Sequence, residues 1–376
     1  MLTIRALDTS RRRDVRAWIE LPYRLYAGDP LWVPQMVDEA KMQLDRRRNP
    51  FFRHSEAVFF LAEQDGRAVG RLAVLENRLY NARTGARRAF FTHFETVEDI
   101  AVATALFEAA FEWCRRRQLD TLVGPKGFLT ADGMGLLIEG FHRRPAIGIP
   151  YNPPFYHDFI QRLGFERETD FLSGYLSADH PVPERLERIA ERVKQRYGFR
   201  IERYRRKREL RRLVPLVVAT YNEAFTENWE YVPITPEEAK VIADRLLTII
   251  QPDLVKLVWK DDRLVGFLLC YPDISAAIQR TGGRLWPFGW FHLLREFGRT
   301  EWVNINGAGI LPAYRGRGVD ALLFVELART IKGSRYKHAI VVQIDEGNSK
   351  MQLEMAALGV GFDTRHRIFR RAVGPG

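Results

Sequence analysis

The sequence predicts an α/β protein of two tandem domains that share one fold. Each domain is expected to be a mostly antiparallel mixed sheet with one parallel crossover, flanked by helices. Two repeated features and one recurring order of elements carry this prediction. The 376 residues suffice for two domains, and 46% hydrophobic with 28% charged residues is a globular composition. We expect one domain at 1–180, a linker at 181–200 and a second domain at 201–376.

The first repeated feature is a β-hairpin. The stretch "AVFFLAEQDGRAVGRLAVL" reads as two apolar strands around Asp65-Gly66, and "LVKLVWKDDRLVGFLLCY" has the same form around Asp261-Asp262. Both turns continue as Asp-x-Arg-x-Val-Gly, and Val69 aligns with Val265 at an offset of 196 residues. The alternative is two unrelated hairpins, which would not fix any spacing.

The second repeated feature is a helical pattern that ends in Gly-Phe. Gly164-Phe165 ends the first copy and Gly361-Phe362 ends the second, at an offset of 197 residues. Two independent features at nearly one offset indicate duplicated domains.

The order of elements also repeats. Each half begins with a helical region, at Pro22–Leu44 and at Leu210–Ile250, before its hairpin. A strand, a helix and a second strand follow, which predicts a parallel crossover inside an otherwise antiparallel sheet. In the second half these elements are strand Val303–Ile310, helix Val319–Ile331, strand His338–Ile344 and helix Asn348–Leu358.

The charge indicates an anionic partner. The net charge is +11, and phosphorylated cofactors, nucleic acid and anionic membranes all fit it. The arginines stand in short dispersed runs, which are typical of solvated helix faces, so we expect no nucleic-acid partner. Cys114 and Cys270 give no disulfide framework and no metal spacing. No signal peptide or membrane-spanning run is recognisable, so we expect a cytoplasmic protein.

A glycine- and arginine-rich loop is the main candidate site. Arg315-Gly316-Arg317-Gly318 stands between the strand ending at Ile310 and the following helix. Glycines there allow main-chain N–H groups to converge on a phosphate at a helix N-terminus, and arginines add charged donors.

Three other interpretations of this loop are considered. Gly316-x-Gly318-x-x-Ala321 also fits a dinucleotide-binding fingerprint, with Asp345 after the next strand. A proline-containing stretch interrupts that fingerprint, and only 31 residues follow Asp345. A nucleoside-triphosphate loop is excluded because Gly-Lys-Ser/Thr is missing. A basic turn without a ligand stays open.

The stretch "ILPAYRGRGVDALL" resembles the acyl-CoA-binding motif of the Gcn5-related N-acetyltransferase (GNAT) superfamily, Arg/Gln-x-x-Gly-x-Gly/Ala. We place Ala313 at its leading position. In the first half the equivalent loop "TVEDIAVATAL" is acidic and lacks glycine, so that domain is expected to shape the substrate site without binding CoA. The resemblance implies acyl-CoA as co-substrate, no metal, and cofactor contacts from Ile310, Leu311, Arg315, Gly316, Arg317, Gly318, Val319 and Asn348.

The resemblance also implies direct attack of an amine on the thioester, with main-chain N–H groups of strand Val303–Ile310 polarising the carbonyl. The candidate bases are Glu301, near the start of that strand, and Glu227, which together with Tyr231 stands among aromatic residues. Each carboxylate has a structural alternative as a solvated strand end or helix end. The tyrosine that usually protonates the thiolate is replaced by Met355 or Ala357, so Tyr231 or water would substitute.

An aromatic insertion follows the second hairpin. The segment Leu285–Phe297 is rich in tryptophan, phenylalanine and leucine and is bounded by arginines, which fits either contact with a membrane surface or a buried apolar cap. An apolar tunnel for an acyl chain is compatible with either.

The whole chain also resembles a group of tandem-domain bacterial proteins, through the phrases "LYAGDPLWVPQ", "IPYNPPFY" and "YNEAFTENWEYVP". That group includes bacterial ceramide synthases. Lipid N-acylation is the favoured activity. A small-molecule or protein N-acetyltransferase and a non-catalytic acyl-CoA-binding protein are alternatives, and the oligomeric state is left open.

Overall fold

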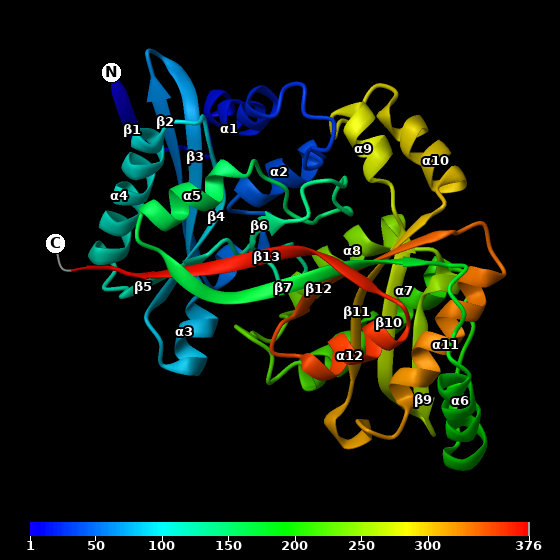
Figure 1. Ribbon diagram of the computed structural model, residues 1–376. Coiled ribbons are helices and arrows are strands. Elements are labelled where there is room, and N and C mark those ends of the chain that lie inside the picture. The colour runs from blue at the N-terminus through cyan, green and yellow to red at the C-terminus, as the bar shows by residue number, and fades with distance from the viewer. Residues whose placement is uncertain (375–376) are drawn as a thin grey trace. The chain divides into compact units, whose positions relative to one another are not determined.

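The computed structural model describes residues 1–374 and divides into two compact units (Figure 1). Unit 1 contains residues 1–171, 275–292 and 364–374, and unit 2 contains residues 172–274 and 293–363. This division differs from the predicted boundaries because segment 275–292 and most of the last strand cluster with unit 1. Three elements contribute residues to both units: β7 (Glu166–Ser177), α10 (Gly289–Arg299) and β13 (Gly361–Ala372).

Unit 1 is built on a mixed sheet whose strand order is β1-β2-β3-β4-β5-β13, with β6 also paired to β13. Within the described residues of this sheet, β4 pairs with β5 in parallel and the other pairs are antiparallel. Asp65 and Gly66 both take positive φ, +51° and +77°, as a two-residue hairpin turn requires. The strands are β1 (Leu2–Ala6), β2 (Glu56–Gln64), β3 (Arg67–Glu76), β4 (Arg88–Thr96), β5 (Thr121–Gly124) and β6 (Leu136–Glu139).

Helix α4 makes the parallel crossover of unit 1 and covers one face of its sheet (Figure 1). Leu106 and Phe107 of α4 share one core with Leu72 and Phe91 of the strands. The repeated Val-Gly has a physical reason here: a Cβ at Gly70 would lie 2.9 Å from Leu106 Cδ1. The helices are α1 (Arg12–Leu25), α2 (Val37–Leu44), η1 (Pro50–Arg53), α3 (Arg78–Thr84), α4 (Ile100–Arg116), α5 (Phe155–Arg162) and α9 (Ser275–Thr281).

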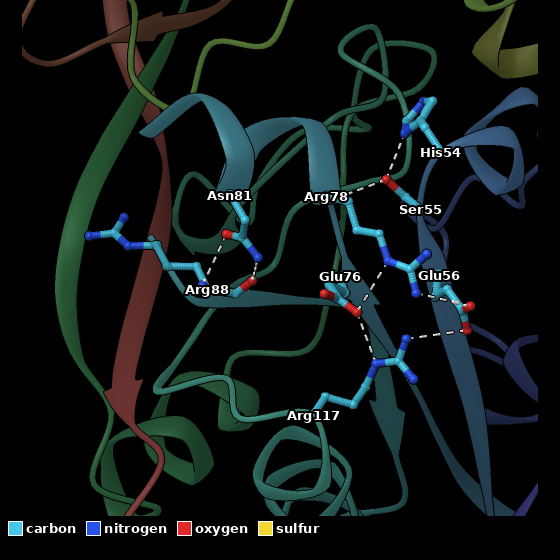
Figure 2. Close-up of polar contacts among 8 residues, drawn as sticks. All are labelled: His54, Ser55, Glu56, Glu76, Arg78, Asn81, Arg88 and Arg117. Atoms are coloured by element: carbon cyan, nitrogen blue, oxygen red, sulfur yellow. Dashed lines mark hydrogen bonds and ion pairs between the residues drawn. The ribbon is translucent and has the colours of Figure 1, made fainter. Parts of the chain in front are cut away.

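An ion-pair network fastens the loops at one end of this sheet (Figure 2). Arg117, at the end of α4, contacts Glu56 at 3.3 Å and Glu76 at 2.9 Å. Arg78, at the start of α3, contacts the same two carboxylates at 3.2 and 3.8 Å. Each glutamate therefore balances two guanidinium groups, and the network joins β2, β3, α3 and α4.

Unit 2 has the strand order β7-β12-β11-β10-β9-β8, with β11 and β12 parallel. The crossover between them is α11, whose apolar face enters the core with Val265, Leu268 and Val303. The strands are β8 (Phe199–Ile201), β9 (Lys256–Lys260), β10 (Arg263–Pro272), β11 (Trp302–Ile310) and β12 (His338–Asp345). The helices are α6 (Glu184–Tyr197), α7 (Lys207–Ala224), α8 (Pro236–Ile249), η2 (Pro252–Leu254), η3 (Pro312–Tyr314), α11 (Val319–Lys332) and α12 (Ser349–Ala357).

Helix α6 corrects the predicted linker at 181–200. It lies against α11 (Figure 1) and buries Ala190 and Val193 in the core of unit 2. Lys194 also pairs with Glu326 of α11 at 2.6 Å. The charged composition that suggested a linker is the outer face of an amphipathic helix, whose few apolar residues recur at helical spacing.

Candidate functional site

Strand β11 separates from β12 at its C-terminal half. The parallel ladder covers Trp302–Ile305 of β11 and His338–Val341 of β12 and then ends. Just beyond it Gly307 has φ of +98°, and the pairing of β11 with β10 shifts register there. This is the geometry of a β-bulge, which turns main-chain groups out of the ladder. The parallel ladder with β12 therefore ends before the main-chain groups of the bulge.

The predicted loop lies where β11 leads into α11. Gly318, with φ of +81°, is the residue before the first turn of α11, and Gly316 has φ of +72°. An added Cβ at Gly316 would meet nothing within 4 Å, whereas one at Gly318 would lie 2.7 and 2.8 Å from Ile189 and Val193 of α6. Space for a side chain is thus open at Gly316, whereas Gly318 permits the close packing of α6.

This geometry changes the register of the motif. Because Gly318 begins the helix, the pattern Arg/Gln-x-x-Gly-x-Gly/Ala is matched by Arg315, Gly318 and Asp320, rather than by a motif that starts at Ala313. Arg315 supplies the leading cation. Asp320 departs from the pattern, since it places a carboxylate where glycine or alanine is expected.

Arg315 is held by the protein itself. Its guanidinium pairs with Glu227 at 3.0 Å and donates to the carbonyl oxygens of Ala224 and Ile310. It therefore fastens the loop to the end of α7 and to the end of β11. Arg317 instead lies over the ring of Tyr314 at 5.6 Å and is exposed.

Helix α12 is the other predicted contributor. Asn348 is its N-cap, and its Oδ1 accepts from the N–H of Met351 at 3.2 Å. Gly359, with φ of +91°, follows the helix, so the position four residues earlier is Met355, which is buried. Of the two residues considered, Met355 therefore stands at the tyrosine position. Asp345, the acidic residue of the dinucleotide interpretation, accepts from the N–H of Gly347 and shapes the turn before α12.

Three charged residues that the sequence interpretation missed connect α11 with α12. Lys350 Nζ lies 3.4 Å from Asp320 Oδ2 and 3.5 Å from Glu354 Oε1. Burial, and next the charge of Asp320, raise the pKa of Glu354 to about 7. The departure of Asp320 from the motif was the only signal for this cluster, and it required the correct register.

The predicted catalytic residues do not lie together. Glu301 precedes β11, at the end remote from the bulge, and its ion pair with Lys337 lowers the pKa of its carboxyl group. Glu227 lies beside the loop through Arg315, and 78% of its side chain is exposed. Tyr231 is buried, and its hydroxyl donates to the carbonyl oxygen of Asn222 at 2.6 Å.

In unit 1, the main-chain groups at the places equivalent to the bulge and the loop bond to other groups of the protein. The side chain of Asp99 accepts from the N–H of Ala101 at the N-terminus of α4. The hydroxyl of Tyr156, which is fully buried, accepts from the N–H of Thr96 at 2.7 Å and donates to the carbonyl oxygen of the same residue at 3.0 Å. Lys126 N–H donates to Phe91 O at 2.8 Å, across the region where β4 and β5 diverge. These contacts leave unit 1 without the open loop found in unit 2.

The aromatic segment is exposed rather than a buried cap. The exposed fractions are 79% for Trp286, 72% for Phe288, 47% for Trp290, 52% for Phe291 and 64% for Leu294. Arg284 stacks on the ring of Tyr23 at 4.8 Å. Within residues 1–374, no helix combines the length and apolar character needed to cross a bilayer.

Comparison with solved structures defines the class. A tandem GNAT protein from the clavulanic acid biosynthesis pathway superposes with a TM-score of 0.60 at 14% identity, and the match covers all of both chains. A GCN5-related N-acetyltransferase from Sphaerobacter thermophilus superposes with a TM-score of 0.53 at 15% identity, over all of this chain and 96% of the other. The chain is thus a tandem-domain protein of the GNAT acyltransferase fold.

Sequence comparison then gives the family. Protein YghO of Escherichia coli K12 is 28% identical over 370 residues, which are 96% of this chain and 94% of that protein. The bacterial ceramide synthase of Caulobacter vibrioides is 30% identical over 284 residues, which are 75% of this chain and 73% of that enzyme. No family model matches the chain. The chain belongs to the family of the bacterial ceramide synthase and is an acyltransferase.

Proposed function

We propose that the protein transfers an acyl group from acyl-CoA to the primary amine of a lipid, a long-chain base. The observation that carries this proposal is the bulge at Gly307, which lies near the C-terminal end of β11, shortly before the loop around Gly316. The bulge would bind the thioester carbonyl, and the head of α11 would bind the diphosphate. The pantetheine chain of acyl-CoA would run along the few residues between these two places. The diphosphate contacts would come from the loop amides and Arg317.

The chemistry requires three contributions from the protein. Main-chain N–H groups at the bulge would stabilise the oxyanion that forms when the amine attacks the thioester carbon. A base removes a proton from the ammonium, so that the neutral amine attacks the thioester carbon. When the tetrahedral intermediate collapses, the C–S bond breaks, the nitrogen loses its second proton, and the thiolate of CoA leaves and is protonated through water. Of the predicted residues we propose Glu227 as that base, because it lies beside the loop through Arg315, whereas Glu301 precedes the other end of β11. Tyr231 would fix the segment after α7 to that helix through the carbonyl oxygen of Asn222 rather than donate a proton.

Two observations support a lipid acceptor. The relative from Caulobacter vibrioides is named for ceramide synthesis. The exposed aromatic segment 286–294 also provides an apolar surface beside cationic Arg284 and Arg295. Indole and phenyl rings favour the interface between water and lipid, and arginines favour anionic headgroups. We propose that this segment holds the protein at the inner face of an anionic membrane, where a lipid amine is reached.

One further activity uses the same loop. Acetyl transfer to a small-molecule or protein amine would need the loop amides and the bulge but no membrane contact, and the acetyltransferase folds of the structural neighbours favour it as the second candidate. A protein that binds acyl-CoA without turnover would use the loop alone.

Product formation separates these candidates. The full chain is incubated with palmitoyl-CoA and sphinganine, and in parallel with acetyl-CoA and polyamines, and the N-acyl products are measured by mass spectrometry. The proposal predicts the palmitoyl amide, and a R317E variant should lose most of it. Turnover with acetyl-CoA and polyamine only would contradict the lipid proposal, and CoA binding without any product would favour the binding protein.

Vesicle flotation tests the membrane surface. The protein should float with vesicles of phosphatidylglycerol and phosphatidylcholine, and substitution of Trp286 and Phe288 by serine should reduce the bound fraction about tenfold. Leu216, which is 46% exposed on α7, provides the matched control, since L216S removes an apolar side chain elsewhere. Equal flotation of the wild type, the double variant and the control would contradict the assignment.

A further inference from the structure

The sheet of unit 2 carries a group of polar side chains beside the bulge, on the face turned away from α11. Tyr271 of β10 and Asn304 of β11 are cross-strand partners, so their side chains project from the same face. Asn306 stands two residues further along β11 and shares that face, and its Nδ2 donates to the Tyr271 hydroxyl at 2.8 Å. Val303 and Ile305, which alternate with the two asparagines, enter the core that contains α11.

Asn304 has a buried acceptor that the protein does not use. The residue is fully buried, with 0% exposed, and its Nδ2 donates to Asp273 Oδ1 at 3.3 Å. Within the described residues its Oδ1 has no hydrogen-bond partner. Because a buried oxygen without a partner loses its hydration and gains nothing in return, a bound donor at this atom would recover that loss.

Tyr271 has an unused donor on the same face. Only 3% of the residue is exposed, and its hydroxyl oxygen accepts from Asn306. Among the described groups of the protein, none accepts the hydrogen of this hydroxyl. Burial raises the pKa of Tyr271, so the hydroxyl keeps its hydrogen at neutral pH. Tyr271 and Asn304 thus provide one unused donor and one unused acceptor on neighbouring strands.

The bulge gives access to this group. Gly307 is exposed and Asn306 is partly exposed, so solvent reaches the end of the group that lies next to the bulge. The other face of β11 is closed by the core around α11. Beyond the bulge, Phe225 covers the strand, since an added Cβ at Gly309 would lie 2.8 Å from its ring. An amine that attacks a thioester at the bulge would therefore approach past Asn306.

We propose, on the basis of the proposed N-acyl transfer, that Tyr271 and Asn304 bind the polar head of the acceptor and select an amine with oxygen groups on the carbons near its nitrogen. The Tyr271 hydroxyl donates to one oxygen of the acceptor, and Asn304 Oδ1 accepts from a hydroxyl group. These two bonds hold the nitrogen at the bulge, beside the thioester carbon.

The size of the selection follows from the groups that would stay unpaired. A plain alkylamine satisfies neither the donor of Tyr271 nor the acceptor of Asn304. Sites that bond a substrate hydroxyl discriminate strongly against analogues that lack it. We expect about tenfold for each of the two groups, and hence a kcat/KM about 100-fold higher for an oxygenated amine than for a plain amine of equal length.

Competition between amines tests this selection. The full chain receives palmitoyl-CoA and an equimolar mixture of sphinganine, 1-deoxysphinganine and octadecylamine in mixed micelles, and mass spectrometry of the amides gives the ratios of kcat/KM. Wild type should favour sphinganine over octadecylamine about 100-fold, with 1-deoxysphinganine between them. N304L and Y271F should each lower this ratio about tenfold and leave the kcat/KM for octadecylamine unchanged.

Y336F provides the matched control. Tyr336 is also 3% exposed and belongs to unit 2, and its hydroxyl donates to Gln251. Y336F therefore removes a buried tyrosine hydroxyl away from the bulge, and it should keep the amine ratio of wild type. Since each ratio is measured within one sample, a smaller folded fraction in a variant does not change it.

The outcomes separate this inference from the proposed function. A sphinganine-to-octadecylamine ratio that is equal in wild type, N304L and Y271F would overturn the inference and leave the proposed acyl transfer standing. A ratio that falls equally in Y336F would also overturn it, because the loss would not depend on the place of the hydroxyl. Wild-type protein that forms no amide from any of the three amines would overturn both.

Discussion

Replacement of Gly318 by alanine tests the packing of the loop against α6. An alanine there must adopt a φ of +81°, which costs about 1–2 kcal/mol for a residue with a Cβ. Its Cβ would also lie 2.7 and 2.8 Å from methyl groups of Ile189 and Val193, and overpacking of this kind costs about 1–3 kcal/mol. We expect the two costs together to destabilise unit 2 by about 2–5 kcal/mol.

Gly316 provides the matched control. It has a similar φ of +72°, but its added Cβ meets nothing within 4 Å, so G316A should cost only about 1–2 kcal/mol. For a unit of this size 1 kcal/mol lowers the Tm by about 2–4 °C. Calorimetric unfolding of the full chain, with the transition of unit 2 fitted separately, should place G318A several degrees below G316A. Equal Tm values for the two variants would refute the packing of α6 on the loop.

Three more predictions follow from particular contacts. R317E should weaken CoA binding about tenfold with little change in Tm. R315E should weaken binding and also lower the Tm, because Arg315 bonds to Glu227 and to two carbonyl oxygens. Calorimetric titration and thermal unfolding measure the two effects, and equal Tm values for the two variants would mean that Arg315 contacts only the ligand. Y156F should destabilise unit 1 by about 1–3 kcal/mol, because it leaves the buried N–H of Thr96 without its acceptor, and should leave the Kd for CoA unchanged; a weaker Kd would indicate a ligand at unit 1. The pKa of Glu354 is raised from 4.5 to about 7, so its contribution to the free energy of unfolding is present below about pH 4.5 and is lost as the pH rises to about 7. The free energy of unfolding in urea should therefore depend less steeply on pH for E354Q than for wild type. Parallel pH dependences of the two proteins would contradict this.

The elements of unit 2 were predictable because their signals are local. The apolar alternation of β11 and the helical spacing of α11 each lie within one short window, and the predicted bounds differ from the observed ones by one residue at an end. The repeated Val-Gly was also informative, since at Gly70 it marks the close approach of a crossover helix to the sheet.

The errors arose where the decisive contacts are distant in sequence. Helix α6 looked like a linker because only two of its side chains are buried, and the helix against which they pack, α11, lies more than a hundred positions later. The register of the loop was shifted by two residues because both glycines fit a cradle, and only the start of α11 distinguishes them.

In the candidate site, too, some features have a local sequence signal and others depend on contacts between distant residues. The glycines and arginines of the loop could be found in the sequence, because their chemistry is typical of phosphate binding. The pairing of Arg315 with Glu227 joins residues 88 positions apart, and that of Lys350 with Asp320 joins residues 30 positions apart, so no periodic pattern reports them. The bulge at Gly307 had one local signal, a glycine inside a strand, that indicates such an irregularity.

A crystal structure of the full chain with CoA tests the central claim most directly. The account predicts that phosphate oxygens of CoA lie about 3 Å from main-chain nitrogens between Gly316 and Val319, with the pantetheine between β11 and β12. CoA bound at the corresponding loop of unit 1, or a loop of unit 2 that makes no contact with the diphosphate, would contradict it.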